Sequence, residues 1–306
     1  STTFIWHGGE PTIAGIEFYE KVVCIQKKFR RPGQQVINTI QTNATLVDSK
    51  WADFFATNNW NVGISLDGPE FLHNKTRIDV GKQGTFSRVV RGLEVLREKD
   101  LKIGAIAVIN KQSLNYPEEI FNTMYGLGLS FSANSCSARP SDPDEVKNLA
   151  ITHTEYAEFL LKLFELWVAK DDPRFRITPL EDVTRTILGG KPSLCKFKGE
   201  CQRYVTVDYN GDVYPCDEFL NGQYLLGNLL QQDFAQISAN KEFENYYRGR
   251  LQISRLCSNC NWVDVCRGGC MREWDGKKSI DEPQREEYCK ARILLFQGIK
   301  DRLAVT

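Results

Sequence analysis

The sequence predicts an α/β protein in which alternating strands and helices are followed by a small cysteine-rich α+β domain. Residues 1–135 alternate short apolar runs with helical patterns, which is typical of βαβ units and a parallel sheet. Beyond Pro192 the pattern changes to short segments rich in cysteine and glycine, and eight of the ten cysteines follow residue 194. We therefore expect one domain over residues 1–192, including a connecting helix, and a second over residues 193–306.

The elements of the first domain follow one another in order along the chain. Strands are expected over residues 3–6, 36–41, 62–66, 103–109 and 129–133, and helices over 16–30, from 48, from 85 and from 117 to about 126. The helix from residue 85 carries Val89, Leu93 and Leu96 on one face, which is the apolar spacing of a half-buried helix. Asp48 and Pro117 are residue types that favour the start of a helix.

Two polar stretches of the first domain are expected to be loops, over residues 67–84 and 134–150. After the second loop, Thr152 and Glu155 have the spacing of a capping box, which predicts a helix that continues to about Lys170.

A β-hairpin is expected between Arg203 and Pro215 in the second domain. Residues of strand-forming type alternate on both sides of Asn210-Gly211, a dipeptide that favours a two-residue turn. Such a turn sets Cys216 opposite about Val205 and brings Cys201 and Cys216 to the same end of the hairpin.

Charge and hydropathy exclude several classes of protein. Lys+Arg and Asp+Glu both number 39, so the chain lacks the basic excess that is usual in nucleic-acid-binding proteins. No apolar run approaches the length of a membrane span, and no signal-peptide pattern is present. We expect a cytoplasmic protein with neither a nucleic-acid nor a membrane partner. In such a protein, clustered cysteines bind metal more often than they form disulfides.

The late cysteines form a ladder with short steps. Its members are Cys195, Cys201, Cys216, Cys257, Cys260, Cys266, Cys270 and Cys289. A C-x2-C step lets two thiolates point at one metal centre, and both zinc and iron–sulfur sites use it. Eight thiolates make two sets of four, so spacing alone suits two [4Fe–4S] clusters and two four-thiolate zinc sites equally. A zinc-bound binding module without redox chemistry is therefore an alternative.

The complete ladder, together with Gly211, resembles the SPASM domain of radical S-adenosylmethionine (SAM) enzymes. The resemblance implies two auxiliary [4Fe–4S] clusters with interleaved ligands. It assigns one cluster to Cys195, Cys201, Cys216 and Cys270, and the other to Cys257, Cys260, Cys266 and Cys289.

The first domain carries motifs that point to the same family. HGGEPT at residues 7–12 resembles the GGEP motif after the second strand of a radical SAM barrel, and QTNATL at 41–46 resembles the family's QTNGTL. The resemblance implies that Gly8 and Gly9 allow SAM to approach the backbone and that Glu10 accepts hydrogen bonds from the SAM ammonium group. The implied fold is a partial (β/α)6 radical SAM barrel whose first strand is missing.

SLDGP at residues 65–69, followed by His73 and Arg77, also resembles a stretch of this family. The resemblance implies that Ser65 and Arg77 contact SAM and that Asp67 lies beside the substrate entrance. Asp67-Gly68-Pro69 is in addition a tight-turn sequence.

The C-x3-C-x2-C triplet that holds the SAM-cleaving cluster in this family does not occur in the sequence. We expect it in an N-terminal segment missing before Ser1, where it would hold a third [4Fe–4S] cluster needed for activity. The alternative is a degenerate relative that keeps only the scaffold.

The resemblance implies an oxidoreductase that modifies a peptide or protein by hydrogen abstraction, with an electron donor such as flavodoxin or ferredoxin. The WHGGEPTIAG opening resembles peptide maturases, so we favour crosslinking, as a cyclophane or thioether, of a ribosomally made precursor peptide. The alternative is an anaerobic sulfatase-maturating enzyme that oxidises Ser or Cys to formylglycine. In both, Asp217 is the candidate catalytic base, because relatives that mature sulfatases have an Asp directly after this cysteine.

Overall fold

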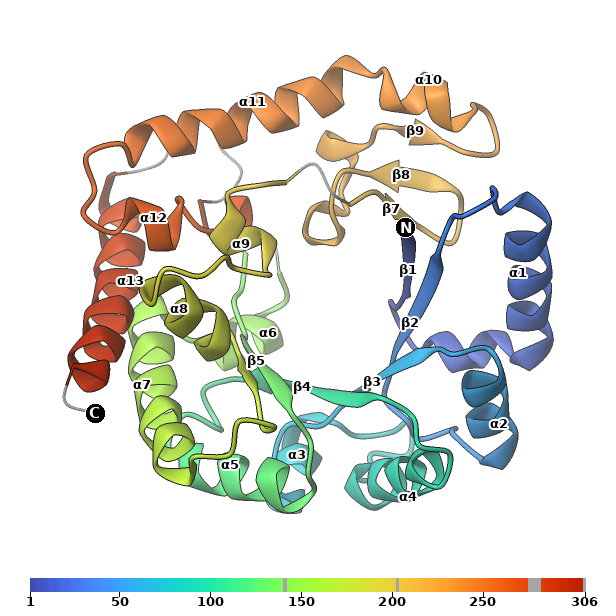
Figure 1. The fold of residues 1–306 in the computed structure, drawn as a ribbon, viewed down its shortest axis with the longest axis horizontal. Coiled ribbons are helices and arrows are strands. Elements are labelled where there is room, and N and C mark those ends of the chain that lie inside the picture. The colour runs from blue at the N-terminus through green and yellow to red at the C-terminus, as the bar shows by residue number, and fades with distance from the viewer. Residues whose placement is uncertain (140–141, 202–203, 275–281, 305–306) are drawn as a thin grey trace. The chain divides into compact units, whose positions relative to one another are not determined.

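The computed structural model describes residues 1–139, 142–201, 204–274 and 282–304 (Figure 1). The chain divides by packing into two compact units. Unit 1 comprises residues 1–151 and 162–178, and unit 2 comprises residues 152–161 and 179–306. Residues 179–192 pack with the cysteine-rich part, although the sequence placed them before the boundary. Asp182 explains this grouping, because its buried carboxylate accepts hydrogen bonds from the backbone N–H groups of Ser193 and Leu194, at 2.9 and 2.6 Å.

Unit 1 is built on a parallel sheet whose strands lie in sequence order, β1-β2-β3-β4-β5-β6. The strands are β1 (Thr2–Trp6), β2 (Val36–Thr42), β3 (Asn61–Ser65), β4 (Ile103–Ile109), β5 (Phe131–Ser135) and β6 (Ile177–Thr178). Each strand pairs in parallel with the next, which confirms the α/β prediction and the expected strands. The short strand β6 was not predicted, since two residues give no periodicity.

The helices of unit 1 connect successive strands. They are α1 (Ile16–Phe29), α2 (Ser49–Thr57), α3 (Glu70–Thr76), α4 (Phe86–Arg97), α5 (Pro117–Gly126) and α6 (Asp144–Leu149), with a 3₁₀ turn η1 (Pro11–Ala14). Figure 1 shows α1, α2, α4 and α5 along the outer side of the curved sheet. The helix α7 (His153–Lys170) follows, as its capping box predicts: Thr152 Oγ1 accepts from Glu155 N at 3.1 Å, and Glu155 Oε2 accepts from Thr152 N at 2.7 Å.

Two of the expected loops contain helices, so those expectations were wrong. The segment 67–84 contains α3, which buries only Leu72 and His73 and is too short to show an apolar period. The segment 134–150 contains α6, which buries no residue at all and therefore leaves no hydrophobic pattern in the sequence. Residues 140–141 of that segment lie outside the described residues.

Unit 2 holds a small antiparallel sheet of β7 (Thr206–Val207), β8 (Asp212–Tyr214) and β9 (Gly227–Asn228). The hairpin is confirmed, but Thr206 pairs with Tyr214 and Val207 with Val213, one residue away from the expected register. The connection is longer than a two-residue turn and has Gly211 at φ +85°, the left-handed conformation that glycine adopts without strain. Arg203, where the hairpin was expected to begin, lies outside the described residues.

The helices of unit 2 range from single 3₁₀ turns to a helix of 22 residues. They are α8 (Leu180–Ile187), α9 (Cys195–Lys198), η2 (Asp217–Phe219), η3 (Gly222–Tyr224), α10 (Phe234–Ser238), α11 (Lys241–Leu256), α12 (Val263–Cys266), η4 (Met271–Trp274) and α13 (Glu282–Leu303). Within the part of the chain that the structure describes, no helix has the length and apolar character needed to cross a bilayer.

Candidate functional site

The motifs of unit 1 meet at the carboxyl edge of the sheet. The segment with Gly8, Gly9 and Glu10 follows β1, Thr42 ends β2, and Ser65 ends β3. In open parallel sheets, ligands bind at this edge. Gly8 and Gly9 have φ of +92° and +53°, and a Cβ added to either would meet no atom within 4 Å. The backbone therefore requires glycine there, and the space beside it is open to a ligand.

Glu10 ties the loop after β1 to the end of β2. Its Oε1 accepts from Thr12 N at 3.0 Å and from the hydroxyls of Thr12 and Thr42, both at 2.6 Å. Its Oε2 accepts from Asn43 N at 2.7 Å. Oε1 is thus fully used, whereas Oε2 retains acceptor capacity for a ligand ammonium group. The contact with SAM that the resemblance implies stays a prediction and rests on Oε2.

Asp67 and Arg77, which follow β3 in the chain, form a bidentate ion pair. Arg77 Nε lies 2.6 Å from Asp67 Oδ2, and Arg77 Nη2 donates to Oδ1 at 3.1 Å. Oδ1 also accepts from Val108 N at 2.9 Å, and Asp67 is only 4% exposed. This burial does not match the expected position beside a substrate entrance: Asp67 instead anchors Arg77. The neighbouring Ser65 hydroxyl accepts from Gln41 Nε2 at 3.3 Å.

His73 is fully buried beneath this pair in a defined tautomer. Its Nδ1 accepts from Asp67 N at 3.3 Å, and its Nε2 lies 3.0 Å from Thr85 Oγ1. Since the Thr85 hydroxyl donates to the Arg77 carbonyl at 2.9 Å, it accepts the proton of Nε2. Burial lowers the pKa of His73 to about 4, with the Arg77 charge acting in the same direction and Asp67 opposing it. The imidazole is therefore neutral at physiological pH.

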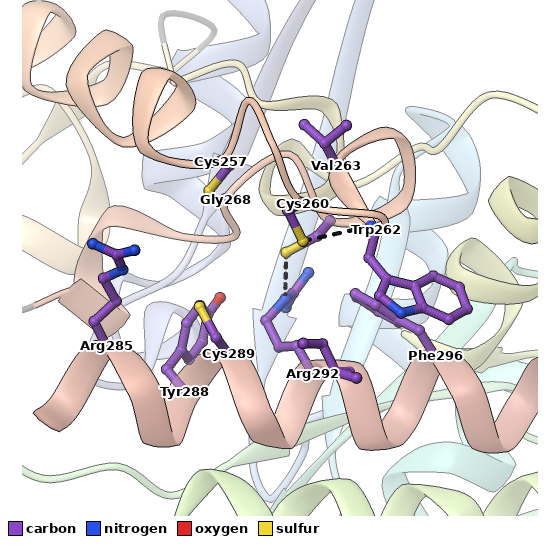
Figure 2. A pocket seen from close by; sticks show the side chains of 12 residues that line it. Cys257, Cys260, Trp262, Val263, Gly268, Arg285, Tyr288, Cys289, Arg292 and Phe296 are labelled. Atoms are coloured by element: carbon purple, nitrogen blue, oxygen red, sulfur yellow. Dashed lines mark hydrogen bonds between the residues drawn. The ribbon is translucent and has the colours of Figure 1, made fainter. Parts of the chain in front are cut away.

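In unit 2, Cys257, Cys260, Cys266 and Cys289 line one cavity of about 200 Å³. These are the four cysteines that the resemblance assigns to one cluster. Figure 2 shows Cys289 rising from α13 toward the segment that carries Cys257 and Cys260. Burial raises the pKa of the Cys289 thiol, and the nearby Cys266 and Cys260 add to the rise.

Of the other four cysteines, two pack against a buried cluster that also contacts Cys257 and Cys289 of the first set. Cys201 and Cys216 pack against the buried Phe219 and Tyr246. Burial raises the pKa of Cys270 to about 12, and Cys195 contributes to the same shift. Burial likewise raises the pKa of Cys216, with smaller contributions from Asp217 and Cys270.

The donor sets fit a bound cluster. Buried thiols resist ionisation in an apolar setting, and a metal centre supplies the positive charge that stabilises their thiolates. No disulfide joins any of the ten cysteines, all of which are among the described residues. Within the described ranges, no three His, Cys, Asp or Glu side chains are grouped closely enough to hold one metal ion.

Asp217 and Glu218 follow Cys216 directly and have different surroundings. Cys216 Sγ donates to Asp217 Oδ1 at 3.2 Å, and the Asp217 side chain is exposed. Glu218 is instead held in an ion pair by Arg272. Of the two carboxylates, Asp217 is the more exposed, and it contacts a cysteine of the ladder.

One contact that the sequence analysis missed is made by Arg292. Its Nε donates to Cys266 Sγ at 2.9 Å, and the side chain lines the same cavity as the four thiols (Figure 2). A signal was present in the sequence, because Cys289 and Arg292 are three residues apart, a spacing that places two residues on one face of a helix such as α13.

Comparison with known proteins agrees with this geometry. The radical SAM superfamily model matches residues 1–124, and the SPASM model, described as an iron–sulfur cluster-binding domain, matches residues 195–261. A cysteine-type anaerobic sulfatase-maturating enzyme of Clostridium novyi is 33% identical over 274 residues, covering 88% of this chain and 73% of the relative. A serine-type enzyme of Bacteroides thetaiotaomicron is 27% identical over 312 residues, covering 97% and 75%.

A solved structure shows the same likeness in three dimensions. Native anSMEcpe with bound AdoMet and Cp18Cys peptide superimposes with a TM-score of 0.89 at 29% identity, covering 99% of this chain and 84% of the other. The chain belongs to the radical SAM superfamily, among the members that carry an iron–sulfur cluster-binding SPASM domain. It is an enzyme of radical, oxidoreductase-type chemistry, and the relatives named above are sulfatase-maturating enzymes.

Proposed function

We propose that this chain is the catalytic part of an anaerobic sulfatase-maturating enzyme, which oxidises a Cys or Ser side chain of a sulfatase to formylglycine. The observation that carries the proposal is the 33% identity to a cysteine-type enzyme over 88% of the chain. The structural match to anSMEcpe with its Cp18Cys peptide supports the same class of substrate. These findings favour the formylglycine alternative over the crosslinking reaction that the opening motif suggested.

The carboxyl edge of the unit 1 sheet is the proposed SAM site. Gly8 and Gly9 leave the backbone accessible, and Glu10 Oε2 has a free acceptor position for the ammonium group. Arg77 is held in place by Asp67, so the guanidinium is oriented before a ligand arrives. Preorganised groups of this kind bind a ligand without the entropic cost of ordering a long side chain.

Two sets of four cysteines are the proposed cluster ligands in unit 2. Cys257, Cys260, Cys266 and Cys289 hold one [4Fe–4S] cluster, which the shared cavity supports. Cys195, Cys201, Cys216 and Cys270 hold the other, and the packing of Cys201 and Cys216 against one buried cluster supports this set. A cavity of about 200 Å³ has the volume of several water molecules, which is more than a single zinc ion fills.

Formylglycine formation needs a hydrogen atom, a proton and an electron to leave the substrate side chain. SAM and the clusters, when bound, supply the hydrogen-abstracting radical and the electron exchange. The protein supplies a base for the proton on the substrate sulfur or oxygen, and we assign this role to Asp217. Its carboxylate is exposed to a substrate, whereas Glu218 is neutralised by Arg272. The resulting thioaldehyde of a Cys substrate releases sulfide on hydrolysis, and a Ser substrate gives the aldehyde directly.

The proposal is tested by turnover of peptides in the natural protein with its SAM-cleaving cluster. Sulfatase peptides with Cys, Ser or Ala at the modified position are incubated without oxygen with SAM and a reduced flavodoxin, and the products are analysed by mass spectrometry. We expect an aldehyde, trapped by a hydrazide probe, from Cys or Ser and none from Ala. A crosslinked peptide without an aldehyde would contradict the proposal and favour the hypothesis of a peptide-crosslinking enzyme.

A further inference from the structure

Arg292 occupies an unusual place for a charged side chain. Its guanidinium carbon lies 4.9 Å from the ring centre of Phe197, 5.4 Å from that of Tyr288 and 5.0 Å from that of Phe296. Cation–π contacts of this kind hold the charge in a largely apolar cage. The cage fixes the orientation of the guanidinium plane and leaves its nitrogens few directions in which to donate.

One of those directions is toward the cluster site. Nε donates to Cys266 Sγ at 2.9 Å, and Arg292 lines the cavity together with all four thiols of the set (Figure 2). Nη2 is buried and has no hydrogen-bond partner among the described residues. A buried guanidinium nitrogen without an acceptor is costly. A cluster in the cavity would offer sulfur acceptors and negative charge to it.

Arg285 provides a comparison on the same helix. It lines the same cavity and carries the same charge, but no hydrogen bond from it to a cysteine is among those described. Hydrogen bonds to cluster sulfurs and nearby charge are the protein's means of setting a cluster's reduction potential. Arg292 provides both, whereas Arg285 provides charge at most.

We propose that Arg292 is a positioning residue that stabilises the reduced state of the cluster held by Cys257, Cys260, Cys266 and Cys289. The inference rests on the proposed cluster assignment and adds a residue outside the cysteine ladder. Reduction adds negative charge to a cluster, and a fixed cation that donates to its ligand sulfur favours that state. The potential of this cluster is therefore higher with Arg292 than without it.

The experiment is a redox titration of the reconstituted chain with dithionite, followed by electron paramagnetic resonance. A C195A/C201A background removes the other cluster, so that the signal belongs to the one beside Arg292. Arg292→Met removes charge and donor but keeps the stem, and Arg292→Lys keeps the charge but loses the planar donor. Arg285→Met is the matched control. We expect Arg292→Met to disfavour reduction by tenfold or more, which is a shift of about 59 mV for one electron.

The expected order of potentials is parent, then Arg292→Lys, then Arg292→Met, with Arg285→Met close to the parent. An unchanged potential in Arg292→Met, or an equal shift in Arg285→Met, would overturn the inference. If Arg292→Met does not retain its cluster, the test rests on Arg292→Lys. An unchanged reduction potential in Arg292→Lys would show that the hydrogen bond to Cys266 has no role. Iron analysis distinguishes failure of the cluster assignment from failure of the proposed role of Arg292. If the parent background binds no iron, the cluster assignment is wrong. If it binds iron but the potential of Arg292→Met is unaltered, only the role of Arg292 is wrong.

Discussion

Arg77 donates two hydrogen bonds to the buried carboxylate of Asp67, from Nε to Oδ2 at 2.6 Å and from Nη2 to Oδ1 at 3.1 Å. The Asp67 backbone N–H also donates to His73 Nδ1, so the ion pair and the imidazole form one network. The SLDGP stretch therefore does more than turn the chain after β3. It fixes the position of the arginine that we propose to contact SAM.

The first prediction concerns the strength of this ion pair. Asp67→Asn removes the charge partner of a mostly buried arginine, and we expect a loss of about 2 kcal/mol in the free energy of unfolding. We also expect weaker SAM binding, because Arg77 loses its anchor. Arg88→Met, which breaks the more exposed pair with Asp79, is the control and should change stability far less. Urea unfolding and calorimetric SAM titration measure the two effects, and equal losses in both variants would argue against the network.

The second prediction concerns pH and His73. Its pKa is about 4 in the folded chain and near 6.5 when unfolded, so only the unfolded state takes up a proton between these values. The contribution of the neutral imidazole to the free energy of unfolding is fully present above pH 6.5. It is lost progressively as the pH drops toward 4, by up to about 3 kcal/mol. His73→Gln lacks this titration. The difference between the two proteins in urea unfolding at several pH values isolates the histidine, and parallel curves would contradict its buried neutral state.

The third prediction concerns the turn between Cys266 and Cys270. Gly269 has φ +73°, and an added Cβ would fall within 1.7 Å of the Tyr288 hydroxyl. Gly269→Ala combines backbone strain with a clash, so we expect a loss of about 3 kcal/mol and a lower iron content. Gly222→Ala is the matched control, because a Cβ there meets nothing within 4 Å. Thermal unfolding of the two variants measures the contrast, and similar midpoints would show that the turn tolerates a side chain.

The fourth prediction concerns the cluster ligands. After reconstitution without oxygen, we expect about eight iron atoms per chain, with a brown colour and no zinc. Cys260→Ala should lose about half of this iron, because it removes a ligand of one set only. Cys24→Ala is the control, since this exposed cysteine belongs to neither set. Elemental analysis of all three proteins decides, and stoichiometric zinc in the parent would favour the zinc-bound binding module instead.

Much of this arrangement could be predicted from the sequence, because strong local patterns carry it. The strand β4 is a continuous apolar run, and α4 shows a clear helical period. Short elements escaped prediction where they bury almost nothing, as in α6. The hairpin register was wrong by one residue, since Asn210-Gly211 fits both a two-residue turn and a longer connection with Gly211 in the left-handed conformation.

The residues of the candidate site likewise fall into those that the sequence predicted and those that it did not. The cysteines were found because their spacing is a property of the chain itself. Arg292 was missed because its role depends on a contact with Cys266, 26 residues away, and on rings from separate elements. The burial of Asp67 was also missed, since a tight-turn sequence gives no sign of the partner that will cover it.

The last prediction tests the base. Asp217→Asn keeps the size of the side chain and its contact with Cys216 but removes its ability to accept a proton. In the natural protein we expect formylglycine formation to fall by roughly a hundredfold or more, which is the usual contribution of a positioned base. SAM cleavage should largely persist, because hydrogen abstraction precedes the proton transfer. Glu218→Gln is the control: it loses the ion pair with Arg272 but no proposed proton acceptor, so product formation should change little. 5′-Deoxyadenosine and the aldehyde are measured in the same reaction, and an unchanged ratio of the two in Asp217→Asn would assign the proton to another group.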